Sequence, residues 1–522
     1  MSHDYIIVGA GSAGAPLAAR LSEDAETHVL LLEAGPDYQS SDRPDAMKSP
    51  NPFGIILDPA YGQYRYDDLM ARGSTVQAPR PYWRGRGVGG CSAMNGQIAI
   101  RGMLEDFNEW AARGCEGWSG EEVLPYFKKL EDDLDFGDKP YHGTGGPLPV
   151  YRAPLQQWGP VDLALREAAL DLGYYGWADD CNAPDATGVS PYPINSRNGV
   201  RVSTADAYLD PARDRPNLTV IGNALVDRVV LDGKRATAVR VRVDGEWKEF
   251  AAREIILAAG TIHTPTILVR SGIGRAPELQ ALGLPIVLDL PVGQNLVEHS
   301  GVWIGLQIKP EQQVPSVNFR HTNCCVRYSS QLGGAGKNDM IMIAMNISEM
   351  SDAGRERGLL IVDTFQTFSR GSVRLTSIDP SAQPEVDLCM LADERDLVRM
   401  RDGFKRLFAV SRHPAFTAIA DRIYGTVTGD DLTAVPPDDE LDHWLLAECH
   451  DAQHPVGTCR MGPLGDPRSI VDPNCRVIGA DGLRVIDASV MPENPRANTH
   501  FTTVMIAEKM ADRLRGLRAR RA

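Results

Sequence analysis

Three glycines near the start of the chain, Gly9, Gly11 and Gly14, form the pattern GxGxxG. They follow an apolar run and precede an alanine-rich stretch, which predicts a strand, a tight turn and a helix. In such a turn the glycines let the backbone approach a pyrophosphate, and the helix N-terminus stabilises the phosphate charge. The pattern therefore predicts a dinucleotide site.

An acidic residue, Glu33, stands about 20 residues beyond the last of these glycines and ends the apolar run 27–32. Its carboxylate can accept hydrogen bonds from ribose hydroxyls, which disfavours a phosphorylated ribose. FAD and NAD both remain open at this point. The first 35 residues or so form one βαβ pattern, which predicts a parallel, doubly wound sheet.

A second glycine-rich segment, Arg84–Gly96, holds five glycines in thirteen residues. It offers many backbone amides and little side-chain bulk, so a flat ring system could lie close to the chain. A plain surface loop is the alternative for this segment taken by itself.

His454, in a glycine-rich loop, is a candidate general base. Removal of a hydride from an alcohol carbon leaves a carbonyl only if the hydroxyl proton is also taken, and a histidine has a suitable pKa. The chain has 11 histidines. Position alone therefore leaves a purely structural role open.

The elements that must position these residues follow from the apolar runs. Strands are predicted at 218–221, 226–231, 236–243, 254–258 and 483–486, and a helix at 502–517. Between 303 and 440 strand-like runs such as 340–345 and 359–365 are mixed with one helix at 392–410. This change of pattern predicts a second domain.

Composition excludes several classes of protein. The 522 residues predict two or three domains. The net charge of -15 opposes binding to nucleic acid. No apolar run reaches the roughly 20 residues of a membrane span, and no leader pattern is evident, so a cytoplasmic location is expected. Nine cysteines without zinc spacing predict reduced thiols and no metal site.

Several separated motifs resemble those of the glucose-methanol-choline oxidoreductase family, over nearly the whole chain. They are Gly9–Gly14 with Glu33–Gly35, Gly85–Gly96, Ala259–Pro265 with Ser271–Gly274, Pro291–His299, His454–Gly462, Gly482–Pro492 and Asn498. The resemblance implies an α/β fold (α+β overall). It comprises a Rossmann-like FAD-binding domain of discontinuous segments (1–155, 196–302 and 440–522) and a smaller substrate domain on an antiparallel sheet (156–195 and 303–439).

The cofactor implied by the resemblance is noncovalent FAD, because Met94 stands where some members attach the flavin through a histidine. Loop 89–96 would touch the flavin ring, Val226 the adenine or ribose, and Asp487 the ribityl chain and pyrophosphate. The expected cofactor contacts are Gly9, Gly11, Ser12, Ala13, Gly14, Glu33, Ala34, Arg86, Gly89, Gly90, Ser92, Met94, Asn95, Gly96, Val226, Asp487, Ala488, Asn498, Thr499 and Thr502.

The resemblance also implies catalytic roles. His454 would lie beside flavin N5 and accept the hydroxyl proton as the hydride leaves. Asn498 would orient the alcohol oxygen, since an amide cannot serve as a base. His500 is a secondary catalytic candidate, with a structural, helix-capping role as its alternative. Gln453, His450 and Phe501 are candidates to line the substrate cavity, and a structural role is expected for His299.

The expected activity is oxidation of a primary or secondary alcohol to the aldehyde or ketone. Its partners would be a small alcohol and molecular oxygen or another electron acceptor, with an oxidase favoured over a dehydrogenase. A flavin-containing lyase of the same fold, a light-driven decarboxylase and a non-catalytic flavin-binding module are the alternatives. Small aromatic or aliphatic alcohols are the expected substrates, because the sequence identifies no aromatic or acidic cage for a quaternary amine.

Overall fold

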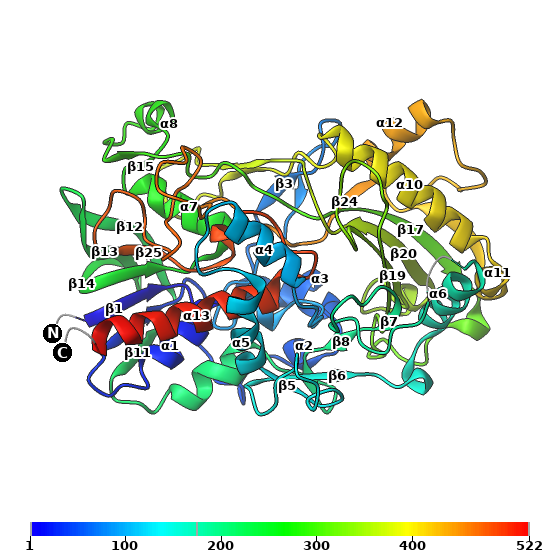
Figure 1. Cartoon of the computed structure of the whole chain (residues 1–522), viewed down its shortest axis with the longest axis horizontal. Coiled ribbons are helices and arrows are strands. Elements are labelled where there is room, and N and C mark those ends of the chain that lie inside the picture. The colour runs from blue at the N-terminus through cyan, green and yellow to red at the C-terminus, as the bar shows by residue number, and fades with distance from the viewer. Residues whose placement is uncertain (1–2, 174–175, 520–522) are drawn as a thin grey trace.

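The computed structural model describes residues 3–173 and 176–519. Two large sheets lie at opposite ends of the molecule, and helices and long loops fill the space between them (Figure 1). None of the helices within this described part is long and apolar enough to cross a membrane.

The first sheet is Rossmann-like and has the order β11-β2-β1-β14-β13-β12, with β25 paired to β14. Its parallel part consists of β11, β2, β1, β25 and the second half of β14, whereas the first half of β14 forms an antiparallel meander with β13 and β12. The strands are β1 (His3–Val8), β2 (Val29–Leu32), β11 (Leu218–Ile221), β12 (Ala224–Asp232), β13 (Arg235–Val243), β14 (Glu246–Leu257) and β25 (Leu483–Val485). The predicted parallel pairing of the first two strands is confirmed.

Burial explains the parallel pairing. β2 and the end of β1 are apolar and buried on both sides, as is typical of parallel strands covered by helices. Helices α1 (Gly14–Leu21) and α13 (Thr499–Ala519) contact each other beside this sheet. This contact joins the two ends of the sequence. The first turn of α13 lies next to the first glycine-rich turn, where His500 contacts Ser12, and the last turns of α13 lie beside the start of β1, where Arg518 pairs with Asp4.

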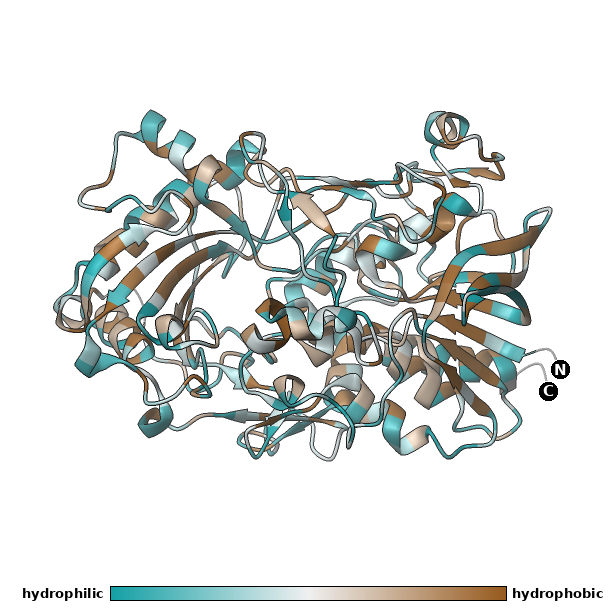
Figure 2. Ribbon diagram, turned by 180° about the vertical axis from the view of Figure 1, so that it is seen from behind, coloured by the Kyte–Doolittle hydropathy of each residue, from teal (hydrophilic) through white to brown (hydrophobic). Residues whose placement is uncertain are grey.

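The second sheet is antiparallel and has the order β23-β17-β20-β19-β18-β7, with β24 paired to β17. Helices α6 (Pro160–Asp171) and α10 (Glu394–Ser411) pack against it from outside (Figure 1). Apolar stretches of both sheets are brown in Figure 2. The strands are β7 (Gly188–Pro191), β17 (Ser300–Ile308), β18 (Cys324–Tyr328), β19 (Met340–Met345), β20 (Arg357–Thr364), β23 (Ala420–Gly425) and β24 (Cys449–Asp451).

Shorter elements join the two sheets and cover their edges. The helices are α2 (Asp45–Lys48), α3 (Phe53–Leu57), α4 (Leu104–Ala112), α5 (Gly120–Leu130), α7 (Gly260–Arg270), α8 (Ala276–Ala281), α9 (Asp352–Arg355), α11 (Pro414–Ile419) and α12 (Asp438–Glu448). The strands are β3 (Met70–Arg72), β4 (Arg80–Pro81), β5 (Glu131–Asp133), β6 (Leu148–Arg152), β8 (Pro193–Ile194), β9 (Ser196–Arg197), β10 (Val200–Arg201), β15 (Ile273–Gly274), β16 (Leu288–Asp289), β21 (Ser372–Arg374) and β22 (Glu385–Asp387).

Two boundaries differ from the sequence-based expectation. The last helix begins at Thr499, three residues before the expected start. The segment after residue 440, expected in the FAD-binding domain, packs at first with the second sheet. There Leu441, Leu445 and Cys449 are buried in that sheet's core, and β24 pairs with the start of β17. Burial of these apolar side chains explains why the chain returns to the first domain only after β24.

Candidate active site

A cavity of about 810 Å³ lies between the two sheets, within the size range of cofactor and substrate sites. It runs from the first glycine-rich turn to the inner face of the second sheet, where Ile343, Ile361 and Asp363 line it. The residues predicted from the sequence that line it are Gly9, Gly11, Ser12, Ala13, Glu33, Ala34, Arg86, Gly90, Met94, Asn95, Gly96, Val226, Gln453, His454, Asp487, Ala488, Asn498, Thr499 and His500.

Three predicted cofactor contacts lie behind this surface. A Cβ on Gly14 would come within 1.7 Å of the Gly9 carbonyl oxygen, so Gly14 lets α1 pack on the turn. The Ser92 hydroxyl donates to the Gly89 carbonyl oxygen at 2.5 Å and contacts the Thr204 hydroxyl. Gly89 adopts φ +86° at the start of the short 3-10 turn Gly90–Ala93. These residues shape the site without lining it.

Three further candidates also lie away from the cavity. Thr502 is fully buried within α13, where Thr503 lines the cavity instead. Phe501 is fully buried in the core of the first domain. His450 stacks on Trp303 at 4.5 Å and bonds to the Thr426 hydroxyl. Because α13 begins at Thr499, its first turn presents positions 499, 500 and 503 to the cavity and turns Phe501 toward the core.

The two glycine-rich segments contact each other at the cofactor end of the cavity. Gly9 adopts φ +102°, and a Cβ there would lie 2.5 Å from the Ala258 carbonyl oxygen. A Cβ on Gly90 would lie 2.8 Å from the Gly11 Cα atom. The bare backbone of both segments and the N-terminus of α1 together form a cradle suited to a pyrophosphate.

The Glu33 carboxylate organises this cradle. Its Oε1 accepts the backbone N–H groups of Gly35 and Gly87, each at 2.9 Å, and its Oε2 accepts that of Ala10 at 2.8 Å. Glu33 thereby connects both glycine-rich segments, a role that the sequence did not reveal. Oε2 keeps one acceptor position for a ribose hydroxyl.

The Asp487 carboxylate is similarly occupied by protein donors. It accepts from Gly260 N at 2.9 Å, Thr264 Oγ1 at 2.6 Å and Ser489 N at 2.8 Å. These bonds fix the start of α7 and the turn after β25 at the cavity wall. Asp487 therefore positions the backbone that a cofactor would meet.

His454 and Asn498 lie side by side on the wall of the cavity. The Asn498 side-chain nitrogen is 3.0 Å from His454 Nε2, and His454 Nδ1 is 3.1 Å from His299 Nδ1. The other nitrogen of His299 lies 3.1 Å from the Pro495 carbonyl oxygen. His299, assigned a structural role from the sequence, thus contacts the candidate base directly.

The hydrogen bonds fix the tautomers of both histidines. The Pro495 carbonyl can only accept, so His299 Nε2 carries a proton and Nδ1 of the neutral ring is an acceptor. His454 Nδ1 must then donate to it, which leaves His454 Nε2 unprotonated. Burial lowers the pKa of His299 to about 4. Burial, His299 and Arg84 lower the pKa of His454 well below its ordinary value, so both rings are neutral at pH 7.

A buried carboxylate, Glu298, holds the His454 backbone. Glu298 Oε1 accepts the His454 backbone N–H at 2.6 Å, and Tyr82 donates its hydroxyl to Oε2 at 2.5 Å. Burial and the Asp451 carboxylate raise the pKa of Glu298 to about 8. The Glu298 carboxyl group therefore holds the backbone of the loop that carries His454.

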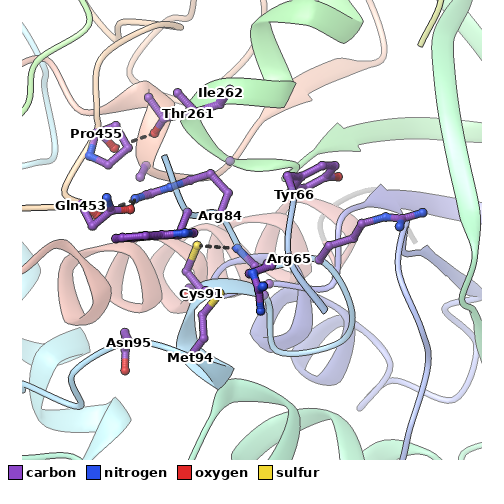
Figure 3. A pocket seen from close by; sticks show the side chains of 18 of the residues that line it. Arg65, Tyr66, Arg84, Cys91, Met94, Asn95, Thr261, Ile262, Gln453 and Pro455 are labelled. Atoms are coloured by element: carbon purple, nitrogen blue, oxygen red, sulfur yellow. Dashed lines mark hydrogen bonds between the residues drawn. The ribbon is translucent and has the colours of Figure 1, made fainter. Parts of the chain in front are cut away.

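Gln453, expected at the substrate cavity, lines it but is tied to its neighbours. Arg84 donates to its carbonyl oxygen at 3.2 Å and to its side-chain oxygen (Figure 3). The Gln453 amide donates to Asp451 Oδ1 at 2.5 Å. Its backbone has φ +63°, unusual for a residue with a side chain. These contacts present the next residue, His454, to the cavity.

His500 lies at the cofactor end rather than beside His454. Its Nδ1 is 3.1 Å from the Ser12 hydroxyl in the first glycine-rich turn, and its buried Nε2 has no protein partner within the described residues. Burial lowers its pKa to about 4. The structure thus brings Asn498, not His500, to the candidate base.

Metal-ligand types meet at one place in the described part of the chain, where ligand atoms of Glu131, Asp133 and His142 lie within 4.8 Å of one another. His142 bonds to Glu131 and to Asp180, each at 2.9 Å, and Asp133 accepts from Arg152 at 2.7 Å. Internal ion pairs account for this cluster, which lies outside the cavity lining.

Several site residues carried no signal recognised in the sequence. Four charged residues among them are Arg84, Glu298, Asp363 and Asp451. Glu298 and Arg84 stand inside quoted motifs, and Asp363 is a single acid in the apolar strand Leu359–Thr364. Burying a charged side chain in an apolar strand lowers the stability of the fold, so such a residue is a candidate for a functional role. The single acid at position 363 was therefore the signal that the sequence offered.

Known proteins resemble this chain over almost its whole length. Family models described as GMC oxidoreductase match residues 3–301 and 367–507. A protein of Paraburkholderia xenovorans called oxygen-dependent choline dehydrogenase is 36% identical, over 99% of this chain and 95% of the relative. The crystal structure of a pyridoxine 4-oxidase from Mesorbium loti matches with TM-score 0.87 and 29% identity, covering 99% of both chains. A fungal aryl-alcohol oxidase shares the fold, with TM-score 0.82 and 24% identity over 98% of both chains.

Proposed function

Since the chain belongs to the GMC oxidoreductase family, we propose that it oxidises a primary or secondary alcohol to the aldehyde or ketone, with His454 as the general base. The observation that carries the proposal is the His454–Asn498 pair, which faces the cavity with His454 Nε2 unprotonated. A base that is neutral at working pH is what proton removal from a hydroxyl requires.

The residues of the cavity fit FAD, the cofactor of this family. Bare backbone at Gly9, Gly11 and Gly90 leaves room for a pyrophosphate, and His500 Nε2 is a buried polar atom without a protein partner among the described residues. Bound FAD would supply the hydride acceptor. Attachment would be noncovalent, since Met94 lines the cavity and its thioether forms no bond with the flavin.

The protein's own groups carry the proton. His454 Nε2 accepts the hydroxyl proton while the carbon loses a hydride, so the C–O bond becomes a carbonyl. The resulting imidazolium keeps its Nδ1–H bond to His299, which passes the polarisation on to the Pro495 carbonyl. The alcohol hydroxyl takes the place of the Asn498 amide N–H at His454 Nε2, and the amide then donates to the alcohol oxygen and fixes its direction toward His454.

The second sheet keeps water from the reacting carbon. Its described residues on the cavity side include the apolar Ile343, Met345, Leu359 and Ile361, and its two carboxylates there are Asp363 and Asp451. A dry wall strengthens the hydrogen bonds of the site and limits competing proton exchange.

An oxidase is our choice over a dehydrogenase. Support comes from the names of the similar proteins, which include an oxygen-dependent dehydrogenase and a pyridoxine 4-oxidase. The electron acceptor would then be molecular oxygen, with hydrogen peroxide as the second product.

The experiment is anaerobic mixing of the purified holoprotein with a panel of alcohols, followed by admission of oxygen. Loss of the oxidised flavin absorbance with at least one alcohol, and rapid return with peroxide, is the expected result. Slow return would assign a dehydrogenase. A flavin that no alcohol reduces would overturn the proposal and favour a lyase or a non-catalytic module.

A further inference from the structure

Asp363 is a buried carboxylate on the cavity wall that lacks a hydrogen bond. It lies in β20, is 4% exposed and lines the cavity. Oδ1 has no partner, and no donor among residues 3–173 and 176–519 reaches the other oxygen either. An unpaired buried carboxylate is costly, so a natural ligand that satisfies it would recover that cost.

The strand register places Asp363 on the cavity face of the second sheet. Asp363 pairs with Gly301 on β17 and with Ile341 on β19, and Ile361 pairs with Trp303 and Ile343. Asp363, Ile361, Trp303 and Ile343 therefore share one face, and apart from Asp363 this part of it is apolar. A Cβ on Gly301 would lie 1.7 Å from Asp363 Oδ1, so the glycine makes room for the carboxylate.

Among the residues that the structure describes, no cation forms an ion pair with this carboxylate. The charge that acts on Asp363 is another carboxylate, Asp451, and together with burial it raises the pKa of Asp363 to about 7. Arg327 shares the same face two strands away, where its Nη1 donates to the Cys181 carbonyl oxygen at 2.8 Å and its Nε and Nη2 have no partner among the described residues. Its charge is not among those that act on Asp363. This end of the cavity therefore favours a positive charge.

Two aromatic side chains, Trp303 and Tyr192, line the same cavity as Asp363. Trp303 lines the cavity with one ring face stacked on His450, and its indole N–H has no partner within the described residues. Tyr192 lines the cavity as well, and the Asp363 charge acts on its hydroxyl. Rings of this kind attract an ammonium group through the negative charge of their faces.

The candidate base and Asp363 line the same cavity. Phe365, two residues beyond Asp363, stacks on His299 at 4.9 Å, and His299 contacts His454. One bifunctional molecule in this cavity can therefore place a hydroxyl at His454 and a charged nitrogen at Asp363.

We propose that the substrate is an alcohol with an N–H cation, a protonated amine or pyridinium, and that Asp363 binds this cation. The inference rests on the proposed alcohol oxidation and names its substrate class. An N–H cation is favoured over a quaternary ammonium because the free oxygens of Asp363 call for a donor, which a quaternary nitrogen lacks.

The test compares two isosteric alcohols, dimethylaminoethanol, which is protonated at pH 8, and neutral isoamyl alcohol. In the FAD-loaded wild type, kcat/KM should favour the cation at least tenfold. In Asp363→Asn this preference should fall at least tenfold, whereas Glu311→Gln, an exposed residue beyond β17, should keep it. An equal preference in wild type and Asp363→Asn, or a preference for choline over dimethylaminoethanol, would overturn the inference.

A binding measurement separates this inference from the proposed function. Dimethylpropylamine has the cation but no hydroxyl, and calorimetry should show that wild-type holoprotein binds it at least tenfold more tightly than Asp363→Asn. If no alcohol reduces the flavin of either protein, the proposed function fails while this difference still tests Asp363. Should Asp363→Asn not fold, competitive inhibition of isoamyl alcohol oxidation by dimethylpropylamine in the wild type decides, and absence of inhibition contradicts the proposal.

Discussion

The two ends of the cavity differ in how their polar groups are satisfied. At the cofactor end, the carboxylates of Glu33 and Asp487 each hold at least three protein donors. At the substrate end, Asp363 and the indole N–H of Trp303 have no partner in the described part of the protein. Carboxylates already held by protein donors suit a preorganised cradle for a cofactor that stays bound, and an unpaired carboxylate suits a cation that arrives and leaves.

The largest effect is expected where the cradle is tightest. Gly90→Ala should abolish FAD binding, because the added methyl would lie 2.8 Å from Gly11 Cα in a residue with φ +50°. The flavin content of the purified variant measures this. Gly516→Ala, near the end of α13 with nothing within 4 Å, is the control and should retain the cofactor. Full flavin content in Gly90→Ala would show that the cradle tolerates bulk.

A smaller effect, a change of about tenfold in the KM for dimethylaminoethanol, is expected when the pH is varied, because Asp363 titrates at the substrate end of the cavity. Burial and Asp451 raise the pKa of Asp363 to about 7. Below that pH the free carboxyl is neutral and cannot attract a cation, and above it the carboxylate can. The KM for dimethylaminoethanol should therefore fall as the pH rises from 6 to 8, while the KM for isoamyl alcohol should not follow. Parallel changes for both alcohols would assign the titration to another group.

The smallest effect is expected at Phe501, which the sequence suggested as a substrate contact. Its ring is fully buried in the first domain, so Phe501→Leu should lower the free energy of unfolding by about 1 kcal/mol. Denaturant unfolding measures this loss, and KM should stay within twofold for every alcohol. A large change of KM would place the ring at the substrate after all.

The sequence predicted the cofactor end better than the substrate end. Gly9, Gly11 and Glu33 belong to a contiguous βαβ unit whose spacing determines its shape. Asp363 meets the cavity only through the pairing of β20 with β17, which are far apart in the chain, and no local spacing encodes that register. Phe501 was misjudged because the start of α13 was expected three residues late, and a helix turns by about 100° per residue.

The sequence predicted His454 and Asn498 as site residues. It did not predict the residues that hold His454 in place. The tautomer of His454 depends on His299 and the Pro495 carbonyl, which come from different segments. Glu298 and Arg84 likewise reach the His454 loop only in the folded chain. Contacts of this kind require the tertiary structure.

The most direct test of the central claim is anaerobic flavin reduction by the best alcohol in His454→Ala, compared with wild type at equal flavin content. Loss of the base should slow reduction by about 10²–10⁴-fold, with the flavin spectrum and melting temperature preserved. His500→Ala, altered at the cofactor end, is the comparison and should reduce far faster than His454→Ala. Reduction of His454→Ala at the wild-type rate would contradict the assignment of the base and, with it, the proposed mechanism.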